Sequence, residues 1–210
     1  GGNFGNISGT SRNRLAAYSL TDMSLTAWNP NVNSGTNIQA ITVSVTGDTV
    51  YAGGTFDKVN GGITRNYLAS FNSSDGTVTD WDPNLNNIAS ALALSGNTLI
   101  VGGSFIAVGG GTTNRNYLAS YNTSTGNLNT WNPDLNQVVH SLVINGSRVY
   151  VAGNFTTVAG GVTTRNHLAA FDTASNFATN WNPNANDLSR AIGTTSTEIY
   201  VGGSFSTILG

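Results

Sequence analysis

The sequence contains no cysteine, which excludes disulfides, thiolate catalysis and cysteine-ligated zinc. Charged residues are also scarce, at 9% of the chain against roughly 25% in an average globular protein. Because lysine and glutamate normally cover exposed helix faces, a chain this poor in both is expected to contain little helix. The net charge of −2 offers no electrostatic footprint for nucleic acid, so no nucleic-acid partner is expected.

Long apolar runs are missing as well. No run approaches the ~20 residues of a membrane-spanning helix, and no basic run suits a membrane surface, so we expect no membrane insertion. No signal peptide is visible at the N-terminus, and the chain opens at Gly1-Gly2-Asn3-Phe4, in the middle of a repeated element. We therefore expect this sequence to be a mature or excised piece of a longer protein.

Proline and tryptophan are rare, but their positions repeat. The chain has four of each, and they form the triplets Trp28-Asn29-Pro30, Trp81-Asp82-Pro83, Trp131-Asn132-Pro133 and Trp181-Asn182-Pro183. A Gly-Gly-x-Phe element and an Arg-Asn pair return at the same spacing of about 50 residues. The arginines of that pair are Arg12, Arg65, Arg115 and Arg165. We expect one array over residues 1–210, with units at about 1–52, 53–101, 102–151 and 152–201 and with residues 202–210 beginning a fifth unit.

Within a unit, apolar residues alternate with the period of two that is typical of β-strands. In the second unit, Leu68–Phe71 and Thr77–Trp81 are expected to form one hairpin, and Ala89–Leu94 and Thr98–Val101 another. Four short antiparallel strands in about 50 residues are typical of one blade of a β-propeller. The sequence therefore predicts an all-β fold, a β-propeller of four-stranded antiparallel blades with four blade-equivalents in the chain.

The two ends of the array are expected to be complementary halves of one blade. Two outer strands precede the first complete blade, and two inner strands follow the last. Joining these halves within one chain would close a four-bladed ring and leave no open strand edge at the seam. Pairing them between two chains would give a homodimer with a closed eight-bladed ring. A third interpretation is a piece cut from a longer array.

The Trp-x-Pro triplet has a structural and a ligand-binding interpretation. Proline cannot donate to a strand ladder, so it ends the outer strand, while tryptophan is large enough to cover the wedge between neighbouring blades. The alternative is a row of exposed indole platforms for sugar rings. Identical spacing in every unit favours a packing joint between neighbours. We therefore expect Trp81→Ala to destabilise the fold.

The repeated arginines also have two interpretations. No carboxylate repeats with them, so each guanidinium is expected to bond loop carbonyls and to stack on an aromatic ring. The alternative is a ring of converging arginines that binds an anion. Repeated hydrogen bonding to loop carbonyls is sufficient to explain the pattern.

Polar side chains gather in the loops that follow each proline, and these loops share one face of a propeller. The candidate ligand-binding residues are Asn31, Asn33, Asn84, Asn86, Asp134, Asn136, Asn184 and Asn186, together with His140 and Arg190 at the start of inner strands. Ser90, His140 and Arg190 occupy one register and differ completely, as residues that distinguish a ligand would. The alternative is a solvated rim without a ligand. On the ligand-binding interpretation, Asn84→Ala alters binding and leaves stability unchanged.

No pattern in the sequence predicts a metal site, a cofactor or a catalytic residue. His140 and His167 are not repeated, no calcium-loop alternation of oxygen ligands is present, and no Ser-His-Asp order recurs. We therefore expect no enzymatic activity. The competing hypothesis is a hydrolase or lyase that uses His140, Arg190 and a carboxylate such as Asp134 or Asp187.

Written out as G-G-x-F, R-N-x-L-A-x-[FY], a D-G or T-G turn and W-[ND]-P, the unit resembles the delta-sixty-type β-propeller repeats. The resemblance covers essentially the whole chain, although the family's phenylalanine position is tryptophan here in all four units. It implies a secreted or surface-attached bacterial protein with an adhesive or scaffolding role, and it supplies no ligand or catalytic residue. The expected function is a non-catalytic module that contacts a protein or glycan through its loop face; a purely structural repeat is the further alternative.

Overall fold

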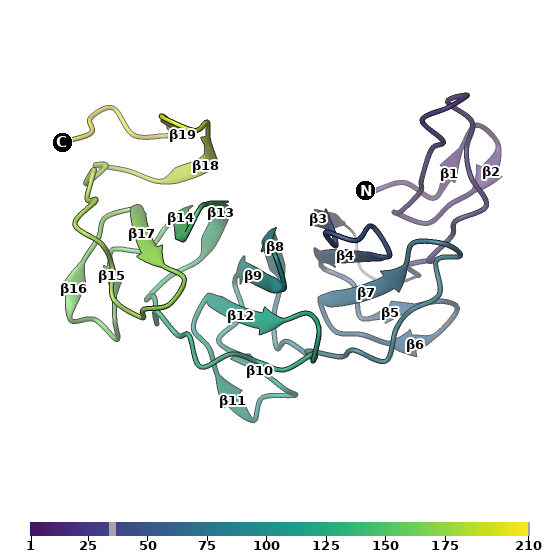
Figure 1. Cartoon of the computed structure of the whole chain (residues 1–210), viewed down its shortest axis with the longest axis horizontal. Helices are drawn as coiled ribbons and strands as arrows, with labels where there is room; N and C mark the ends of the chain where they lie inside the picture. Colours follow the sequence, from purple (N-terminus) through teal and green to yellow (C-terminus); the bar gives the residue numbers. More distant parts are fainter. Residues whose placement is uncertain (34–36, 210) are drawn as a thin grey trace.

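The computed structural model describes residues 1–33 and 37–209, and all regular structure in this part of the chain is β. Figure 1 shows the sheets side by side in an open arc, with the two termini at opposite ends. The expectation of an all-β, antiparallel fold is confirmed. No helix of the length and hydrophobicity needed to cross a membrane occurs in residues 1–33 and 37–209.

Three equivalent three-stranded antiparallel sheets form the middle of the arc. The first sheet contains β3 (Ile38–Val43), β4 (Thr49–Gly54) and β7 (Leu68–Asn72). The second contains β8 (Ala89–Ser95), β9 (Thr98–Gly103) and β12 (Leu118–Asn122). The third contains β13 (Val139–Asn145), β14 (Arg148–Gly153) and β17 (Leu168–Asp172). In each sheet the second strand in sequence lies in the centre, as expected for the inner three strands of a propeller blade.

The fourth strand of each blade is much shorter than the sequence predicts. Instead of a strand over Thr77–Trp81, the structure has a single bridge between Phe71 and Val78, and the other complete sheets have the same bridge at Leu128 and Ala178. The carbonyl of Thr79 accepts a hydrogen bond from the Arg65 side chain, so it does not extend the strand pairing, and Pro83 follows soon after. The edge therefore ends after one bridge.

Small hairpins lie between the second and third strands, where the sequence predicts only loops. They pair β1 (Asn6–Ile7) with β2 (Thr10–Ser11), β5 (Lys58–Val59) with β6 (Ile63–Thr64), β10 (Ala107–Val108) with β11 (Thr113–Asn114), and β15 (Thr157–Val158) with β16 (Thr163–Thr164). Figure 1 places β5–β6, β10–β11 and β15–β16 on the convex side of the arc. Two-residue strands are too short to show a period-2 pattern, so their only sequence signal is the glycine in each turn, which is single in the first hairpin and repeated in the other three.

The ends of the arc are incomplete sheets. The C-terminal sheet has only β18 (Ser189–Thr194) and β19 (Ile199–Gly203), and near the N-terminus a single bridge joins Tyr18 to Leu25. Within the part of the chain that the structure describes, these two ends do not share a sheet. The four-bladed ring that the ends could close within one chain is therefore not formed in this structure.

The core lies within and between the sheets, and the Gly-Gly-x-Phe elements help to build it. Phe56, Phe105 and Phe155 are fully buried. The glycine that precedes the variable residue faces the chain that enters its own inner strand at Gly54, Gly103, Gly153 and Gly203: a Cβ on Gly103 would lie 2.0 Å from the carbonyl oxygen of Ile88. Only glycine allows this close approach, so the element is required by the backbone.

Candidate functional site

The tryptophans form a joint between consecutive blades. In three of them the indole Nε1 donates to carbonyls at the end of the third strand of the next blade or in the turn that follows it: Trp28 to Asn72 (2.9 Å), Trp81 to Gly126 (3.0 Å), and Trp131 to Asp172 (3.1 Å) and Ser175 (2.8 Å). Each ring also meets the third-strand aromatic of that blade edge to face, with centroids 6.3 Å apart for Trp28 and Phe71, 5.3 Å for Trp81 and Tyr121, and 6.0 Å for Trp131 and Phe171. Trp28 and Trp131 are only 5% exposed, so neither offers an open platform to a sugar ring.

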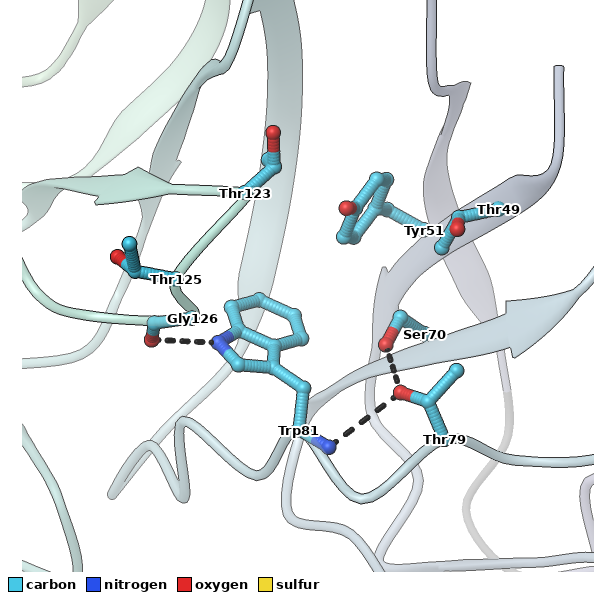
Figure 2. Close-up of a pocket in the computed structure, with 8 residues that line it drawn as sticks. All are labelled: Thr49, Tyr51, Ser70, Thr79, Trp81, Thr123, Thr125 and Gly126. Atoms are coloured by element: carbon cyan, nitrogen blue, oxygen red, sulfur yellow. Dashed lines mark hydrogen bonds between the residues drawn. The ribbon is translucent and has the colours of Figure 1, made fainter. Parts of the chain in front are cut away.

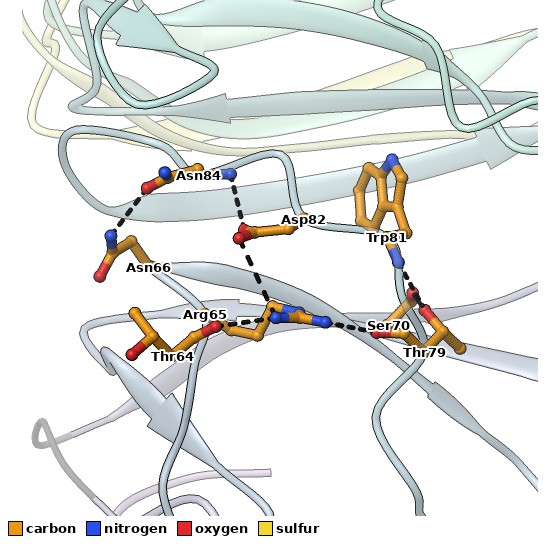
Figure 3. A network of polar contacts seen from close by, with 8 residues as sticks. All are labelled: Thr64, Arg65, Asn66, Ser70, Thr79, Trp81, Asp82 and Asn84. Atoms are coloured by element: carbon orange, nitrogen blue, oxygen red, sulfur yellow. Dashed lines mark hydrogen bonds and ion pairs between the residues drawn. The ribbon is translucent and has the colours of Figure 1, made fainter.

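Each repeated arginine clamps the outer edge of its own blade. Figure 3 shows Arg65, whose Nη1 donates to the carbonyl of Thr64 (2.9 Å) and whose Nη2 donates to the carbonyl of Thr79 (2.7 Å). The equivalent carbonyls are those of Ser11 and Thr26 for Arg12, Asn114 and Asn129 for Arg115, and Thr164 and Thr179 for Arg165. Arg65 also lies 3.9 Å from Asp82, the one triplet in which aspartate replaces asparagine. The terminal nitrogens of these arginines are thus directed at carbonyls of their own unit.

The residue after each proline forms a latch to the Arg-Asn pair. Asn84 has a left-handed backbone (φ 43°), and its Oδ1 accepts a hydrogen bond from Asn66 Nδ2 at 2.7 Å (Figure 3). The same latch joins Asn13 to Asn31 (2.7 Å), Asn116 to Asp134 (2.6 Å) and Asn166 to Asn184 (2.6 Å). Asparagine and aspartate tolerate the left-handed region better than other residues with a side chain, which explains their presence here.

The asparagine two residues further on ties the loop to the outer hairpin. The Oδ1 of Asn86 accepts from the backbone N–H groups of Ile106 (2.9 Å) and Ala107 (3.0 Å). Asn136 makes the same pair of bonds to Thr156 and Thr157, and Asn186 to Ser206 and Thr207. For Asn33, the backbone N–H donates to the carbonyl of Lys58 at 3.2 Å. Seven of the eight loop residues predicted to bind a ligand therefore have side-chain partners inside the fold, and Asn33 is held through its backbone.

A different set of polar residues remains on the concave side of the arc. Each innermost strand has a register shift at one residue, and the residues at these four bulges are Gln39, Ser90, His140 and Arg190. The strands that carry them lie next to one another, β3 beside β8, β8 beside β13 and β13 beside β18 (Figure 1). Bulges re-aim a side chain and are common beside binding sites. Beside each bulge stands the variable residue of a Gly-Gly-x-Phe element or of its Ala-Gly variant: Thr55, Ser104, Asn154 and Ser204.

We call these eight residues the inner rim. Gln39 and Arg190 are exposed, and Ser90 and His140 are partly exposed. His140 Nε2 is hydrogen-bonded to Asn154 Oδ1 at 2.6 Å, and Ser90 Oγ donates to the carbonyl of Val139 in the neighbouring inner strand at 2.8 Å. The shared register of Ser90, His140 and Arg190 was visible in the sequence. Gln39 and the residues beside the bulges were missed, because a bulge leaves no mark on a short alternating pattern.

A pocket lies at the joint between the first and second complete sheets (Figure 2). It has a volume of about 350 Å³ and is lined by Thr49, Tyr51, Ser70, Thr79, Trp81, Thr123, Thr125 and Gly126. Tyr51 meets Trp81 edge to face at 5.6 Å, and Ser70 and Thr79 are hydrogen-bonded to each other. The indole is therefore held between two tyrosines, which suits a packing joint.

The carboxylates named for an enzymatic site are engaged with neutral groups. Asp134 accepts from the amide of Asn116, and Asp187 accepts from the backbone N–H of Leu188 at 2.6 Å. Within residues 1–33 and 37–209, no group of three or more histidine, cysteine, aspartate or glutamate side chains could hold a metal ion.

The repeated sheets, the joints between them and the concave row of inner strands define a propeller-like β protein. No family model and no curated protein matches the sequence. Solved structures show the fold. A structure of the Mitotic Checkpoint Complex matches 91% of this chain and 53% of its own (TM-score 0.62, 12% identity). The extracellular domain of a protein described as a one-component system from B. thetaiotaomicron matches 94% of this chain and 24% of its own (TM-score 0.56, 18% identity).

The computationally designed protein Ika4 is also similar, over 82% of this chain and 92% of its own (TM-score 0.51, 14% identity). The chain spans about half of the first of these three structures and about a quarter of the second. At such low identity, the likeness establishes the propeller-like fold and nothing about activity.

Proposed function

We propose that the chain is a non-catalytic binding module of an exported bacterial surface protein, and that it contacts a protein or glycan through the inner rim. The observation that carries the proposal is the contrast between repeated and varied positions. The joints, clamps and latches have nearly the same residues in every unit, whereas the bulge position carries an amide, a hydroxyl, an imidazole and a guanidinium. Variation at a structurally fixed, solvent-facing position is what recognition of a ligand requires.

The chemistry of the inner rim suits a polar ligand with hydrogen-bonding groups. Arg190 and His140 stand on neighbouring inner strands, so that end of the rim is rich in donors, while Gln39 and Ser90 offer both donors and acceptors. A glycan or a polar peptide segment presents complementary hydroxyls, amides and carboxylates.

The hydrogen bonds of the titratable groups support binding over catalysis. His140 pairs with an amide, Asp134 with an amide and Asp187 with a backbone N–H, and none of these partners transfers protons near neutral pH. Export and surface attachment rest on the resemblance of the repeat to those of secreted bacterial proteins. They are tested by probing intact cells that produce the parent protein with an antibody against this region.

Binding is tested by applying the labelled chain to a glycan array and to a panel of extracellular matrix proteins. We expect a specific signal that Arg190→Ala or His140→Ala reduces by about tenfold, because each change removes a hydrogen-bonding group from the rim. Arg148→Ala is the matched control: it removes the same charge from an exposed position at the opposite end of its strand. Equal loss of signal in the control would mean that net charge, and not the inner rim, determines binding.

A further inference from the structure

We propose that the ligand of the inner rim is an acidic glycan, which the rim recognises through the carboxylate groups of its sugar units. This assignment rests on the binding function proposed above and specifies the chemical class of the ligand. It follows from three properties of the eight inner-rim residues: their unused hydrogen-bond donors, their charge, and the absence of apolar side chains among them.

Two inner-rim side chains keep hydrogen-bond donors that the fold does not use. The guanidinium of Arg190, with five N–H groups, forms no hydrogen bond or ion pair with the residues that the structure describes. Asn154 Oδ1 is bonded to His140 Nε2 at 2.6 Å, and because an amide oxygen can only accept, the imidazole is the donor. The Nδ2 group of Asn154 has no partner in the described part of the chain. Free donors therefore outnumber free acceptors here, so a ligand must supply acceptor atoms.

The charge of the inner rim is opposite in sign to that of the whole chain. The chain has ten acidic and eight basic residues, yet none of the eight inner-rim residues is acidic and one, Arg190, is cationic. The acids nearest to it in sequence form no ion pair with it. Asp187 accepts from the backbone N–H of Leu188, and Glu198, at the far end of the β18–β19 hairpin, is bonded to Tyr200. An anionic ligand therefore gains an attraction at the rim that a neutral ligand lacks.

The imidazole and the guanidinium stand at the same register of adjacent inner strands. The backbone N–H of Ile192 in β18 donates to Ser141 Oγ in β13 at 3.3 Å, and these residues lie close in sequence to Arg190 and His140. Because β13 lies between β8 and β18, His140 has a neighbouring inner strand on each side (Figure 1). One ligand on the concave side can therefore contact both side chains.

The composition of the inner rim favours a glycan over an acidic peptide. Its other members are amides and hydroxyls: Gln39, Thr55, Ser90, Ser104 and Ser204. Protein partners are usually anchored by aromatic or aliphatic side chains in desolvated pockets, and the rim residues offer no apolar lining for such an anchor. Sugar hydroxyls both donate and accept, so they match amide and hydroxyl side chains, which do the same. A glycan that also carries carboxylates complements the whole rim.

The test compares an acidic oligosaccharide with its uncharged counterpart, namely oligogalacturonate and its methyl ester. The two differ only at the carboxyl group. In titration calorimetry at low salt, we expect the 210-residue chain to bind the acid at least about tenfold more tightly than the ester, because a charge-assisted hydrogen bond is roughly twice as strong as a neutral one. The preference should shrink at high salt, since salt screens exposed charges, while binding of the ester should change little.

Two variants change the charge of the inner rim and leave its shape similar. Arg190→Gln removes the cation but keeps an amide donor, so it should remove most of the preference for the acid. Asn154→Asp keeps an oxygen that accepts from His140 and adds an anion, so it should weaken binding of the acid by about tenfold and affect the ester little. The matched controls, Arg148→Gln and Asn97→Asp, make the same charge changes at exposed positions at the opposite end of a blade. Both controls should keep the preference.

Several outcomes would overturn the acidic-glycan class. They are equal affinity for the acid and the ester, a preference that survives Arg190→Gln, and a preference that the controls remove as well. Tighter binding of poly-glutamate than of oligogalacturonate would identify an acidic peptide instead. Binding of neither oligosaccharide would also overturn the class, and the glycan array and protein panel would then show separately whether the inner rim binds a ligand at all. A rim-dependent signal there would leave the proposed function standing without this ligand class.

Discussion

Asn84 combines a left-handed backbone with a side chain that accepts a hydrogen bond from Asn66. The sequence alone does not distinguish this asparagine from an exposed loop residue that binds a ligand. The structure gives it a framework role, because the latch and the φ of 43° both depend on it. The sequence-based division between a structural Trp81 and a ligand-binding Asn84 therefore needs revision.

Replacing Asn84 with alanine should lower the free energy of unfolding by about 1–3 kcal/mol. The change removes the partner of Asn66 and leaves a β-carbon in the left-handed region without a compensating hydrogen bond. Urea denaturation of the variant measures the loss. Gln137→Ala, at an exposed position in the equivalent loop of the next unit, serves as control and should change stability by less than about 0.5 kcal/mol. A stable Asn84→Ala protein would show that the latch contributes nothing.

Tyr121 departs from its equivalents in the complete blades, which are Phe71 and Phe171. Burial raises the pKa of its phenol above the usual value, although the Arg115 charge opposes the shift. Within the described chain, the buried hydroxyl has no hydrogen-bond partner. A raised pKa in the folded state contributes stability that is present below the unfolded pKa of about 10 and is lost as the pH rises above it.

Tyr121→Phe removes a buried hydroxyl that has no partner, so it should increase the free energy of unfolding by about 1 kcal/mol at neutral pH. Because phenylalanine does not ionise, the variant should also lose less stability above about pH 10. Part of the alkaline loss should remain, because burial also raises the pKa of Tyr51. Thermal unfolding between pH 7 and pH 11 provides the measurement, with Tyr67→Phe at a partly exposed position for comparison. A variant less stable than the parent at neutral pH would mean that the hydroxyl has an ordered partner.

At the scale of the strand, close backbone approach decides which glycines are required. A Cβ on Gly103 would lie 2.0 Å from the Ile88 carbonyl oxygen, whereas a Cβ on Gly193 would meet nothing within 4 Å. We expect Gly103→Ala to cost about 3 kcal/mol or more, because β8 and β9 must separate to admit the methyl group, and Gly193→Ala to be nearly neutral. Comparing the two variants by denaturant unfolding separates this steric effect from the change in unfolded-chain entropy that both Gly→Ala substitutions bring. If the two variants lost similar free energies of unfolding, the close approach at Gly103 would not be the cause.

The strands differ in how well the sequence predicted them, because only some are specified by their own residue pattern. The third strand was placed well, since Leu118–Asn122 has alternating apolar residues between clear turns. The fourth strand was overestimated at Thr77–Trp81, because the carbonyl that would extend it is bonded by Arg65, a residue distant in sequence. The outer hairpins were missed because their stability comes from contacts such as those of Asn86 with Ile106 and Ala107, and not from their own short pattern.

At the scale of the molecule, the repeat spacing predicted the propeller-like fold, and the identical spacing of the tryptophans indicated a joint. The candidate site was only partly predictable. The register shared by Ser90, His140 and Arg190 was visible, but the bulge at this position is a backbone feature. The arrangement of the ends depends on the curvature of the whole arc, which accumulates from small rotations between sheets and has no local signature.

The joint between blades has one further property. The indoles of Trp28, Trp81 and Trp131 donate only to main-chain carbonyls, those of Asn72, of Gly126 and of Asp172 and Ser175, so no acceptor side chain takes part in these bonds. A unit can therefore pack against any following unit whose turn presents a main-chain carbonyl to the indole, whatever side chains that turn carries. An array with such a joint can be lengthened by duplication or rearranged by recombination, and each new order of units interlocks without compensating substitutions. Meanwhile the bulge positions of the units remain free to diverge.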